Sequence, residues 1–173
     1  MTDPNRFSAL AAPGVRALRP YEPGKPESEL GRELGISDIA KLASNENPLG
    51  PSPKAQAALA EALGTLHRYP DGGAFELKAR LAAHHGVAPE RITLGNGSNE
   101  VIELVIRTFV TPADSVVFAE HAFIVYKLAA QAHGVRGVEV KARDYGHDLA
   151  AMRAAVDATT RVVFIANPNN PTG

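Results

Sequence analysis

The sequence predicts an α/β fold in which helices cover both faces of a mostly parallel sheet. Three observations support this prediction. Apolar strand-like runs alternate with helical patterns from Ile92 onward, which is the order of βαβ units. Glycines such as Gly86 and Gly134 close the helical patterns. Of the 173 residues, 45% are hydrophobic and 21% are charged, a globular composition sufficient for one core.

The first 53 residues differ from the rest. Prolines crowd the stretches "RPYEPGKP" and "ENPLGPSP", and each proline restricts itself and the residue before it to extended or turn conformations. We therefore expect residues 1–53 to form an N-terminal arm that runs over a surface, and residues 54–173 to form the regular part of the fold.

Beyond this arm, the helical patterns have recognisable ends. Ser52 is a candidate N-cap, Pro53 suits the first helical position, and Gly64 ends the segment. Asp148 is a second candidate N-cap. The expected helices are "SPKAQAALAEALG", "GAFELKARLAAHHG", "SNEVIELVIRTFV", "FIVYKLAAQAHG" and "DLAAMRAAVDA", and the expected strands are "RITLGNG", "DSVVFA", "VRGVEVKA" and "RVVFIA".

In the helix "SNEVIELVIRTFV", helical spacing allows four apolar side chains to turn inward together. These are Val101, Leu104, Val105 and Phe109.

Composition argues against several classes of function. The net charge of −1 and the absence of Trp give no basis for binding nucleic acid or an anionic membrane. Without Cys there can be no disulfide, thiolate zinc site or Cys nucleophile, and the six His residues form no metal-ligand spacing. No stretch approaches 18 apolar residues, and the N-terminus lacks the apolar region of a signal peptide. We therefore expect a cytoplasmic protein without a metal site.

The stretch "ITLGNGSNE" is the first candidate binding motif. A strand leads through a Gly-rich turn into a helix that starts near Ser98 or Asn99, and the free first-turn amides of a helix bind anions such as phosphate. Glu100 stands where a dinucleotide-binding fingerprint needs its third Gly, which disfavours a dinucleotide site. An ordinary strand-to-helix turn with a polar cap remains the alternative.

Three further residues could face a ligand. An Asn in "NPNNPTG" at a strand end could donate its amide, Tyr69 in "HRYPDGG" projects from a loop, and Phe123 in "EHAFIVYK" could stack on a planar ring. Each has a plain alternative: a turn, a packing Tyr, and a core Phe that opens a helix.

Taken in order, the stretches "LASNENPLGPSP", "RYPDGG", "ITLGNGSNEVI", "HAFIVY" and "PNNPTG" resemble the pyridoxal-phosphate aminotransferases of fold type I. "PNNPTG" marks the wider group, whereas "NENP" followed by "YPD" and "GNGSNE" resembles the class II branch of the histidinol-phosphate aminotransferases and their close relatives. The resemblance extends from Tyr21 to Gly173.

The resemblance implies a role for four residues toward pyridoxal 5'-phosphate. The backbone at Ser98 and Asn99 would hold the cofactor phosphate. Phe123 would stack on the pyridine ring, and Asn170 would hydrogen-bond the phenolic oxygen of that ring.

Three other residues would complete the site. Tyr69 would reach the cofactor phosphate of a neighbouring subunit, which implies a homodimer with shared active sites. Tyr21 and the loop of Asn47 resemble the N-terminal segment that closes over the substrate.

The family pattern often has a Pro two residues before a ring-stacking Tyr, and here His121 and Phe123 stand at these positions. A stacking ring is retained but the hydroxyl is lost, which leaves the fine substrate preference open.

In the family, the Schiff-base Lys, the Asp that binds the pyridinium nitrogen and the Arg that binds the substrate carboxylate follow the "NPTG" turn. None of the six lysines matches the Schiff-base position. We therefore expect residues 54–173 to be the first part of a larger cofactor-binding domain, with no catalytic residue in this chain and no transamination by this chain alone.

The function that the resemblance implies is amino transfer between histidinol phosphate and 2-oxoglutarate or glutamate, a step of histidine biosynthesis. Within the same fold, an aromatic-amino-acid aminotransferase and a threonine-phosphate decarboxylase relative are the alternatives. From another class, a non-catalytic phosphate-binding module is the alternative.

Overall fold

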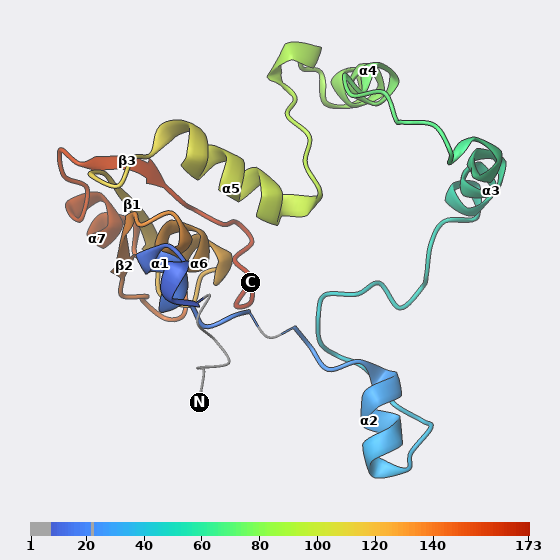
Figure 1. Cartoon of the computed structure of the whole chain (residues 1–173), viewed down its shortest axis with the longest axis horizontal. Coiled ribbons are helices and arrows are strands. Elements are labelled where there is room, and N and C mark those ends of the chain that lie inside the picture. Colours follow the sequence, from blue (N-terminus) through green and yellow to red (C-terminus); the bar gives the residue numbers. More distant parts are fainter. Residues whose placement is uncertain (1–7, 22) are drawn as a thin grey trace. The chain divides into compact units, whose positions relative to one another are not determined.

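The computed structural model describes residues 8–21 and 23–173 (Figure 1). Contacts divide the chain into two compact units, one of residues 22–92 and one that combines residues 1–21 with residues 93–173. These boundaries differ from the expected division after residue 53. The arm and the large domain therefore stay a prediction, and residues 1–7 and 22 of that arm lie outside the described part.

The unit that contains residues 93–173 is built on a three-stranded parallel sheet in the order β2-β1-β3. β1 lies in the centre, with Ser115 opposite Arg136 of β2 and opposite Thr160 of β3. All five residues of β1 are buried, as a central parallel strand requires. The strands are β1 (Ser115–Ala119), β2 (Arg136–Val140) and β3 (Thr160–Val163).

Helices cover both faces of this sheet (Figure 1). α5 (Gly97–Phe109) and α6 (Val125–Ala132) pack on the face that carries Val116 and Phe118, and α7 (Leu149–Ala154) packs on the face that carries Val117 and Ala119. The chain leaves β1 toward one neighbour and then crosses back to the other side of β1. Because crossovers between parallel strands are right-handed, the two connections place their helices on opposite faces. The predicted α/β class with a doubly covered parallel sheet is confirmed.

The inward face of α5 differs from the predicted one. Ile102 and Ile106 are buried in the core, whereas Leu104 is 40% exposed and Phe109 is 64% exposed. The apolar residues of α5 cover a broad arc opposite the polar stripe of Glu100, Glu103 and Arg107, so spacing alone did not identify which part of that arc meets the sheet.

The strand predicted at "RITLGNG" does not form. Ile92 has an extended backbone, with φ −108° and ψ 118°, but residues 92–95 pair with none of the described strands. An extended run becomes a strand only through hydrogen bonds to a neighbour, and that pairing is not encoded locally.

α3 and α4 begin and end close to the predicted positions, whereas α1 and α2 lie in the expected arm, where no helix was predicted. α3 starts at Pro53 after Ser52 at the N-cap position, but its regular turns end at Ala62, and a 3-10 turn extends from Leu63 to Thr65. Gly86, with φ +66°, closes α4 as expected. The remaining helical elements are η1 (Ser8–Leu10), α1 (Pro13–Arg16), α2 (Glu27–Leu34), α3 (Pro53–Ala62), η2 (Leu63–Thr65), α4 (Phe75–His85) and η3 (Pro89–Arg91).

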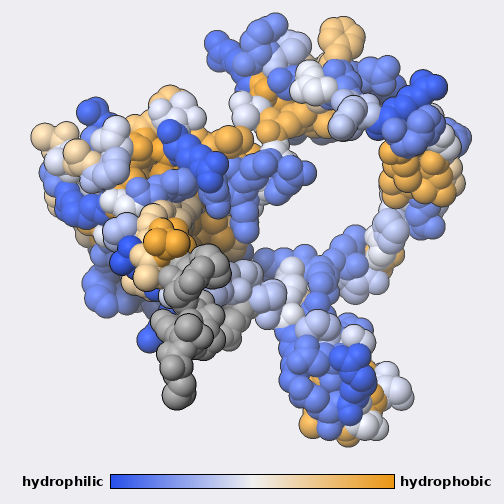
Figure 2. All heavy atoms as spheres, in the orientation of Figure 1, coloured by the Kyte–Doolittle hydropathy of each residue, from blue (hydrophilic) through white to orange (hydrophobic). Residues whose placement is uncertain are grey.

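The unit of residues 22–92 buries little. Ala82 is its one fully buried apolar side chain among the described residues, and Leu59, Leu63 and Leu66 are each more than 60% exposed. Figure 2 shows the apolar atoms of α3 gathered at the surface. The described residues of this unit, 23–92, therefore form no buried core cluster of their own.

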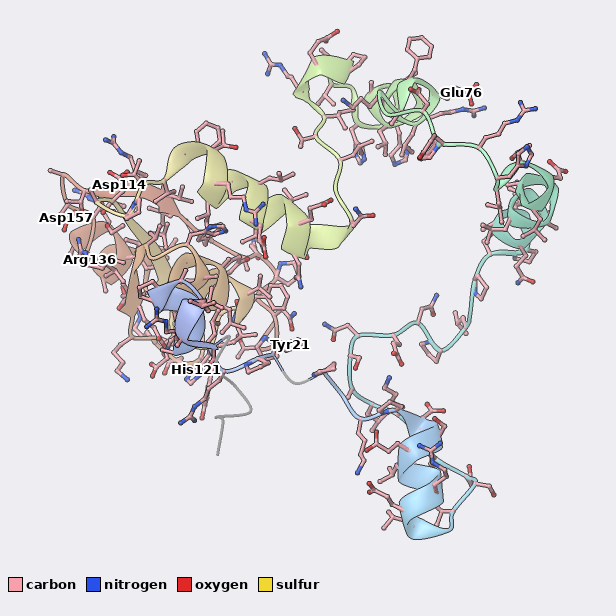
Figure 3. The ribbon with its side chains drawn as sticks, in the orientation of Figure 1. Tyr21, Glu76, Asp114, His121, Arg136 and Asp157 are labelled. Carbon is pink, nitrogen blue, oxygen red and sulfur yellow. The ribbon has the colours of Figure 1, made fainter. Side chains whose placement is uncertain are left out.

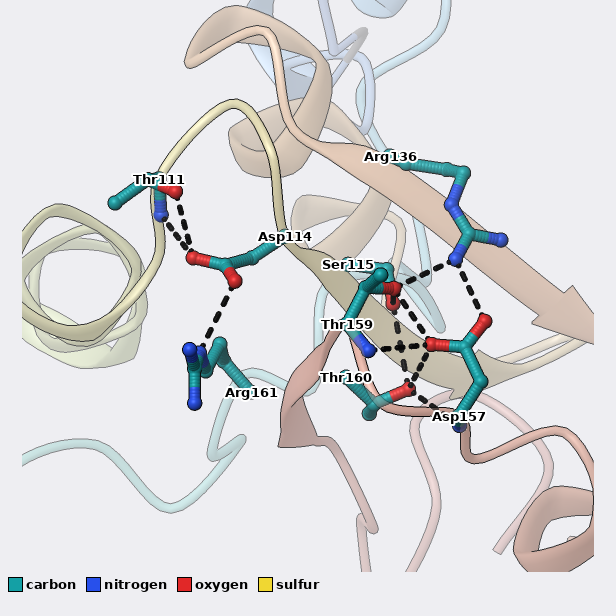
Figure 4. A network of polar contacts seen from close by, with 8 residues as sticks. All are labelled: Thr111, Asp114, Ser115, Arg136, Asp157, Thr159, Thr160 and Arg161. Atoms are coloured by element: carbon teal, nitrogen blue, oxygen red, sulfur yellow. Dashed lines mark hydrogen bonds and ion pairs between the residues drawn. The ribbon is translucent and has the colours of Figure 1, made fainter.

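The amino ends of the strands are joined by a polar network (Figure 4). Asp157 pairs with Arg136 at 2.9 Å and accepts hydrogen bonds from the amide and hydroxyl of Thr159. The buried Ser115 hydroxyl lies 3.2 Å from that of Thr159. These contacts join all three strands at one end of the sheet, so the other end is left for loops.

Two negative findings concern the described residues only. No helix there is long and apolar enough to cross a membrane. No group of three or more His, Cys, Asp or Glu side chains there could hold a metal ion.

Candidate functional site

The carboxyl edge of the sheet is the candidate site, because ligands of open α/β sheets bind where parallel strands end. Three loops leave this edge: residues 120–124 after β1, residues 141–148 after β2, and residues 164–173 after β3. Figure 3 shows His121 of the first loop at the opposite end of the unit from Asp114 and Asp157. The polar network of the amino edge and the candidate site are therefore separated by the length of the strands.

The first turn of α5 lies at this same edge. A short connection joins the end of α5 to the start of β1, so the helix runs antiparallel to the strand. Arg107 near the end of α5 donates from Nε to Nε2 of His133 at 3.4 Å, and His133 follows the last residue of α6. Because α5 runs antiparallel to β1 and ends beside the end of α6, its first turn lies toward the carboxyl edge, and α6 also begins on this side, just after the loop of Phe123.

The N-terminus of α5 is open to a ligand. The amides of Ser98 and Asn99 donate to no carbonyl among the described residues, and both residues are exposed. Glu100 turns back instead, and its Oε2 accepts a hydrogen bond from the amide of Asn96 at 2.6 Å. Free amides at the positive end of a helix dipole bind an anionic group such as a phosphate.

Two glycines shape the approach to these amides. Gly97 has φ +77°, a conformation that L side chains rarely adopt. A Cβ on Gly95 would lie 2.9 Å from Cγ2 of Val101 and 3.1 Å from Oε2 of Glu100. The turn therefore brings the backbone close to the helix start, which only glycine at position 95 permits without displacement.

Phe123 lies in the loop between β1 and α6 and is half-buried. Its ring packs against the core and meets the ring of Tyr126 edge to face, with centroids 6.0 Å apart. Tyr126 in turn stacks on Phe164, with centroids 4.4 Å apart. This row of rings packs against one side of Phe123, and the partial exposure of Phe123 leaves ring surface for a planar ligand.

The loop after β3 contains two adjacent asparagines with different environments. Asn170 is exposed, and its side chain makes no hydrogen bond within the described chain. Asn169 is only 7% exposed, and its Nδ2 donates to the carbonyl of His121 at 3.1 Å and to Oγ1 of Thr172 at 2.7 Å. The side chain of Asn170 is thus unengaged within the described chain, while Asn169 joins two loops.

Asn169 was missed by sequence reasoning. Nothing in "NPNNPTG" distinguishes one asparagine from the next, because the difference comes from contacts with a residue 48 positions away. Oδ1 of Asn169 is buried and has no partner within the described chain.

An ion pair connects the ends of β1 and β2. Glu120 accepts from Nζ of Lys141 at 2.7 Å and from the amide of Ala142 at 3.2 Å. These contacts hold the pKa of Glu120 below its usual value, chiefly through the hydrogen bond from Lys141. The carboxylate of Glu120 therefore stays charged, and its hydrogen bonds join the loop after β1 to the loop after β2.

Tyr21 ends the N-terminal segment of the same unit and is 54% exposed. That segment is held on α6 by close packing at Gly14, whose carbonyl accepts a hydrogen bond from Nε2 of Gln131 at 3.3 Å. A Cβ on Gly14 would lie 2.0 Å from the carbonyl oxygen of Gln131, so only glycine fits there.

Two predicted site residues belong to the other unit. Tyr69 is fully exposed, and Asn47 forms a turn in which its Oδ1 accepts from the amide of Leu49 at 3.0 Å. Asp71, which we did not select from the sequence, accepts from the amides of Gly73 and Phe75 and so fixes the turn after Tyr69. The pattern Asp-Gly-Gly after a Pro is a turn signal that could have identified it.

The predicted residues are therefore distributed over both units. Ser98, Asn99, Phe123, Asn170 and Tyr21 belong to the unit with the sheet, and the first four lie at or beside its carboxyl edge. Together they offer anion-binding amides, an aromatic ring and a free carboxamide, which suit a ligand with a phosphate and a planar polar ring.

Comparison with known proteins gives a consistent result. Residues 37–173 match the family model described as aminotransferase class I and II. The chain is 60% identical over 169 residues to histidinol-phosphate aminotransferase 2 of Pseudomonas aeruginosa, and 57% identical over 168 residues to histidinol-phosphate aminotransferase 1 of Thiobacillus denitrificans. Each alignment covers 96% of this chain but 46% and 44% of the respective relative, so the chain spans about half the length of these curated relatives.

Solved structures also match. The crystal structure of histidinol-phosphate aminotransferase from Sinorhizobium meliloti in complex with pyridoxal-5'-phosphate has a TM-score of 0.84 and 30% identity, and the match covers 100% of this chain and 45% of that one. Aspartate aminotransferase from Thermotoga maritima has a TM-score of 0.71 at 21% identity over 85% of this chain and 42% of its own, a likeness of fold.

Proposed function

From the premise that this chain belongs to the aminotransferase class I and II family, we propose that it supplies part of the cofactor site of a histidinol-phosphate aminotransferase. The reaction is amino transfer between histidinol phosphate and 2-oxoglutarate or glutamate, and it belongs to histidine biosynthesis. The substrate rests on the names of the relatives that are 57–60% identical to this chain.

One structural observation carries the proposal. The open first turn of α5, the partly exposed ring of Phe123 and the free side chain of Asn170 belong to one edge of one sheet. Pyridoxal 5'-phosphate has the matching parts, since it carries a phosphate, an aromatic pyridine ring and a phenolic oxygen. The residues present therefore fit the cofactor.

Each residue has a distinct task toward this cofactor. The amides of Ser98 and Asn99 donate to the phosphate, where the dipole of α5 adds favourable charge. Phe123 packs against the ring and keeps it from tilting. Asn170 donates from its carboxamide to the phenolic oxygen and stabilises negative charge there.

When bound, the cofactor supplies the electron sink on which transamination depends. The reaction would also need a Lys that binds the cofactor covalently and moves a proton, and none of the six lysines of this sequence is assigned to that role. We propose that this Lys, the Asp for the ring nitrogen and the Arg for the substrate carboxylate are supplied by residues other than these 173, so that this chain alone does not transaminate.

The remaining site residues are assigned to partner and substrate: Tyr69 and Asn47 belong to the other unit, and Tyr21 belongs to the unit with the sheet. We propose a homodimer in which Tyr69 reaches the cofactor phosphate of a second subunit, and its fully exposed phenol is available for such a contact. Tyr21 and the loop of Asn47 cover the substrate in this proposal. A cytoplasmic location goes with it, because histidinol phosphate and 2-oxoglutarate are charged metabolites that do not cross a membrane unaided.

A comparison of amino donors tests the assigned substrate. The protein is purified at its natural length, loaded with pyridoxal 5'-phosphate and supplied with 2-oxoglutarate, and glutamate formation is measured. Histidinol phosphate should be used far better than phenylalanine or tyrosine. Preference for the aromatic amino acids would contradict the proposed substrate and favour an aromatic-amino-acid aminotransferase. Release of carbon dioxide from threonine phosphate would contradict the proposed reaction and favour a decarboxylase.

A further inference from the structure

Two loops of the carboxyl edge contain non-glycine residues in a strained conformation. His121 in the loop after β1 has φ +62°, and Asp144 and Tyr145 in the loop after β2 have φ +53° and +61°. Such left-handed residues are costly without glycine and persist where surrounding contacts hold them. The contacts that hold these loops therefore matter for the geometry of the edge.

The two strained loops are held from the same place. Nδ2 of Asn169 donates one hydrogen to the carbonyl of His121 at 3.1 Å and the other to Oγ1 of Thr172 at 2.7 Å. The hydroxyl of Thr172 then donates to the carbonyl of Tyr145 at 2.9 Å. One continuous chain of hydrogen bonds thus joins the carbonyls of two left-handed residues.

Two further contacts close the arrangement. The rings of His121 and Tyr145 lie against each other, with centroids 5.5 Å apart. The amide of Gly173 donates to the carbonyl of Asn169 at 2.8 Å, which fixes the turn that carries both donors. We call Asn169 and Thr172, with their bonds to His121 and Tyr145, the loop clamp.

We propose that Thr172 and Asn169 are positioning residues for the cofactor site, which act by holding the strained loop of His121 so that Phe123 presents its ring in one orientation. This inference rests on the proposed function. His121 is two residues from Phe123, so a change in the backbone conformation of His121 moves the ring of Phe123. Asn170 lies between the two clamp residues in the sequence and shares their turn. Both assigned contacts to the cofactor ring thereby depend on the clamp.

Thr172 gives the cleaner test because two conservative substitutions separate the effect of its hydroxyl from that of its shape. Thr172→Val keeps the shape and removes the hydroxyl, and Thr172→Ser keeps the hydroxyl. Asn169→Asp, which keeps the shape and removes both N–H donors, is the second variant. All are made in the protein of natural length.

The first measurement is amide hydrogen exchange of the cofactor-free protein over residues 120–124 and 143–147. Thr172→Val should raise the exchange rate of these segments about two- to tenfold, the effect of losing one hydrogen bond, and Thr172→Ser should not. The amides of α5 serve as the internal reference. Unchanged exchange in both Thr172→Val and Asn169→Asp would overturn the clamp.

The second measurement is titration with pyridoxal 5'-phosphate. Affinity should fall about two- to tenfold in Thr172→Val and return in Thr172→Ser. Faster exchange with unchanged affinity would mean that the clamp has a structural role only, which overturns the positioning role. If the wild-type protein does not bind the cofactor, the proposed function fails, while the exchange result still decides whether the clamp exists.

Discussion

Nε of Arg161 in β3 lies 3.0 Å from Oδ1 of Asp114, which precedes β1. Oδ2 of the same carboxylate accepts hydrogen bonds from the amide and hydroxyl of Thr111 at 2.9 and 2.7 Å. These polar contacts of Asp114 join the loop after α5, the start of β1 and the edge strand β3 (Figure 4). The amino edge of the sheet is closed by such pairs, and the carboxyl edge is where a ligand can bind.

The first prediction concerns the pH dependence of this contact. Hydrogen bonds from Thr111, and then the pair with Arg161, hold the pKa of Asp114 below its usual value. A lowered folded-state pKa stabilises the fold above the unfolded pKa, and this contribution is lost as the pH falls through the folded pKa. Asp114→Asn should therefore destabilise the protein at pH 7, and the difference from wild type should narrow below about pH 4.

Urea unfolding of the wild type and the variant at both pH values measures this difference. Asp38→Asn, the same change at an exposed position of the other unit, is the matched control and should have little effect. A wild-type-to-variant gap of equal size at both pH values would contradict the assignment.

The second prediction concerns the approach to the helix start. In Gly95→Ala the new Cβ meets Val101 and Glu100 at 2.9 and 3.1 Å, so the first turn of α5 must shift. Affinity for pyridoxal 5'-phosphate should fall about tenfold or more, since charge-assisted hydrogen bonds to the phosphate are lost. Gly64→Ala, where a Cβ meets no atom within 4 Å, is the control and should bind normally. Equal affinity in both variants would place the phosphate elsewhere.

The third prediction concerns the core. Ile106 is completely buried between α5 and the sheet. Ile106→Ala should lower the free energy of unfolding by about 2–5 kcal/mol, and Ile106→Val by about 0.5–1.5 kcal/mol, because the larger cavity costs more. Chemical denaturation at neutral pH measures both. An alanine variant that is as stable as the valine variant would contradict the packing described for α5.

The fourth prediction concerns ring stacking at Phe123. Phe123→Leu keeps an apolar side chain but removes the aromatic face, so cofactor affinity should fall about two- to tenfold. Phe123→Tyr keeps the ring and should bind as the wild type does. Titration followed by the absorbance of the cofactor measures both, and a leucine variant with wild-type affinity would show that the ring has no part in binding.

Local chemistry made several elements predictable. The N-cap role of Asp148 is confirmed, since its Oδ1 accepts from the amide of Ala151 at 3.0 Å. The strands that became β1, β2 and β3 were identified because continuous apolar runs between glycines and polar turns are typical of a buried parallel sheet.

Features that depend on distant contacts were not predictable. Ile92 begins a run with strand-like composition, yet a strand forms only by pairing with a second strand, and composition does not specify that partner. The prediction of the inward face of α5 was wrong because the apolar arc of the helix is broad and spacing does not say which part of it meets the sheet. Ser98 and Phe123, which motif order singled out, stay predicted site residues, whereas Asn169 was not selected because only the folded loops distinguish it from Asn170.

The most direct measurement is a crystal structure of the protein at its natural length with pyridoxal 5'-phosphate bound. The account predicts a phosphate within hydrogen-bonding distance of the amides of Ser98 and Asn99, a pyridine ring against Phe123, and the carboxamide of Asn170 at the phenolic oxygen. A cofactor bound away from the carboxyl edge of the sheet, or held there without contact to the first turn of α5, would contradict it.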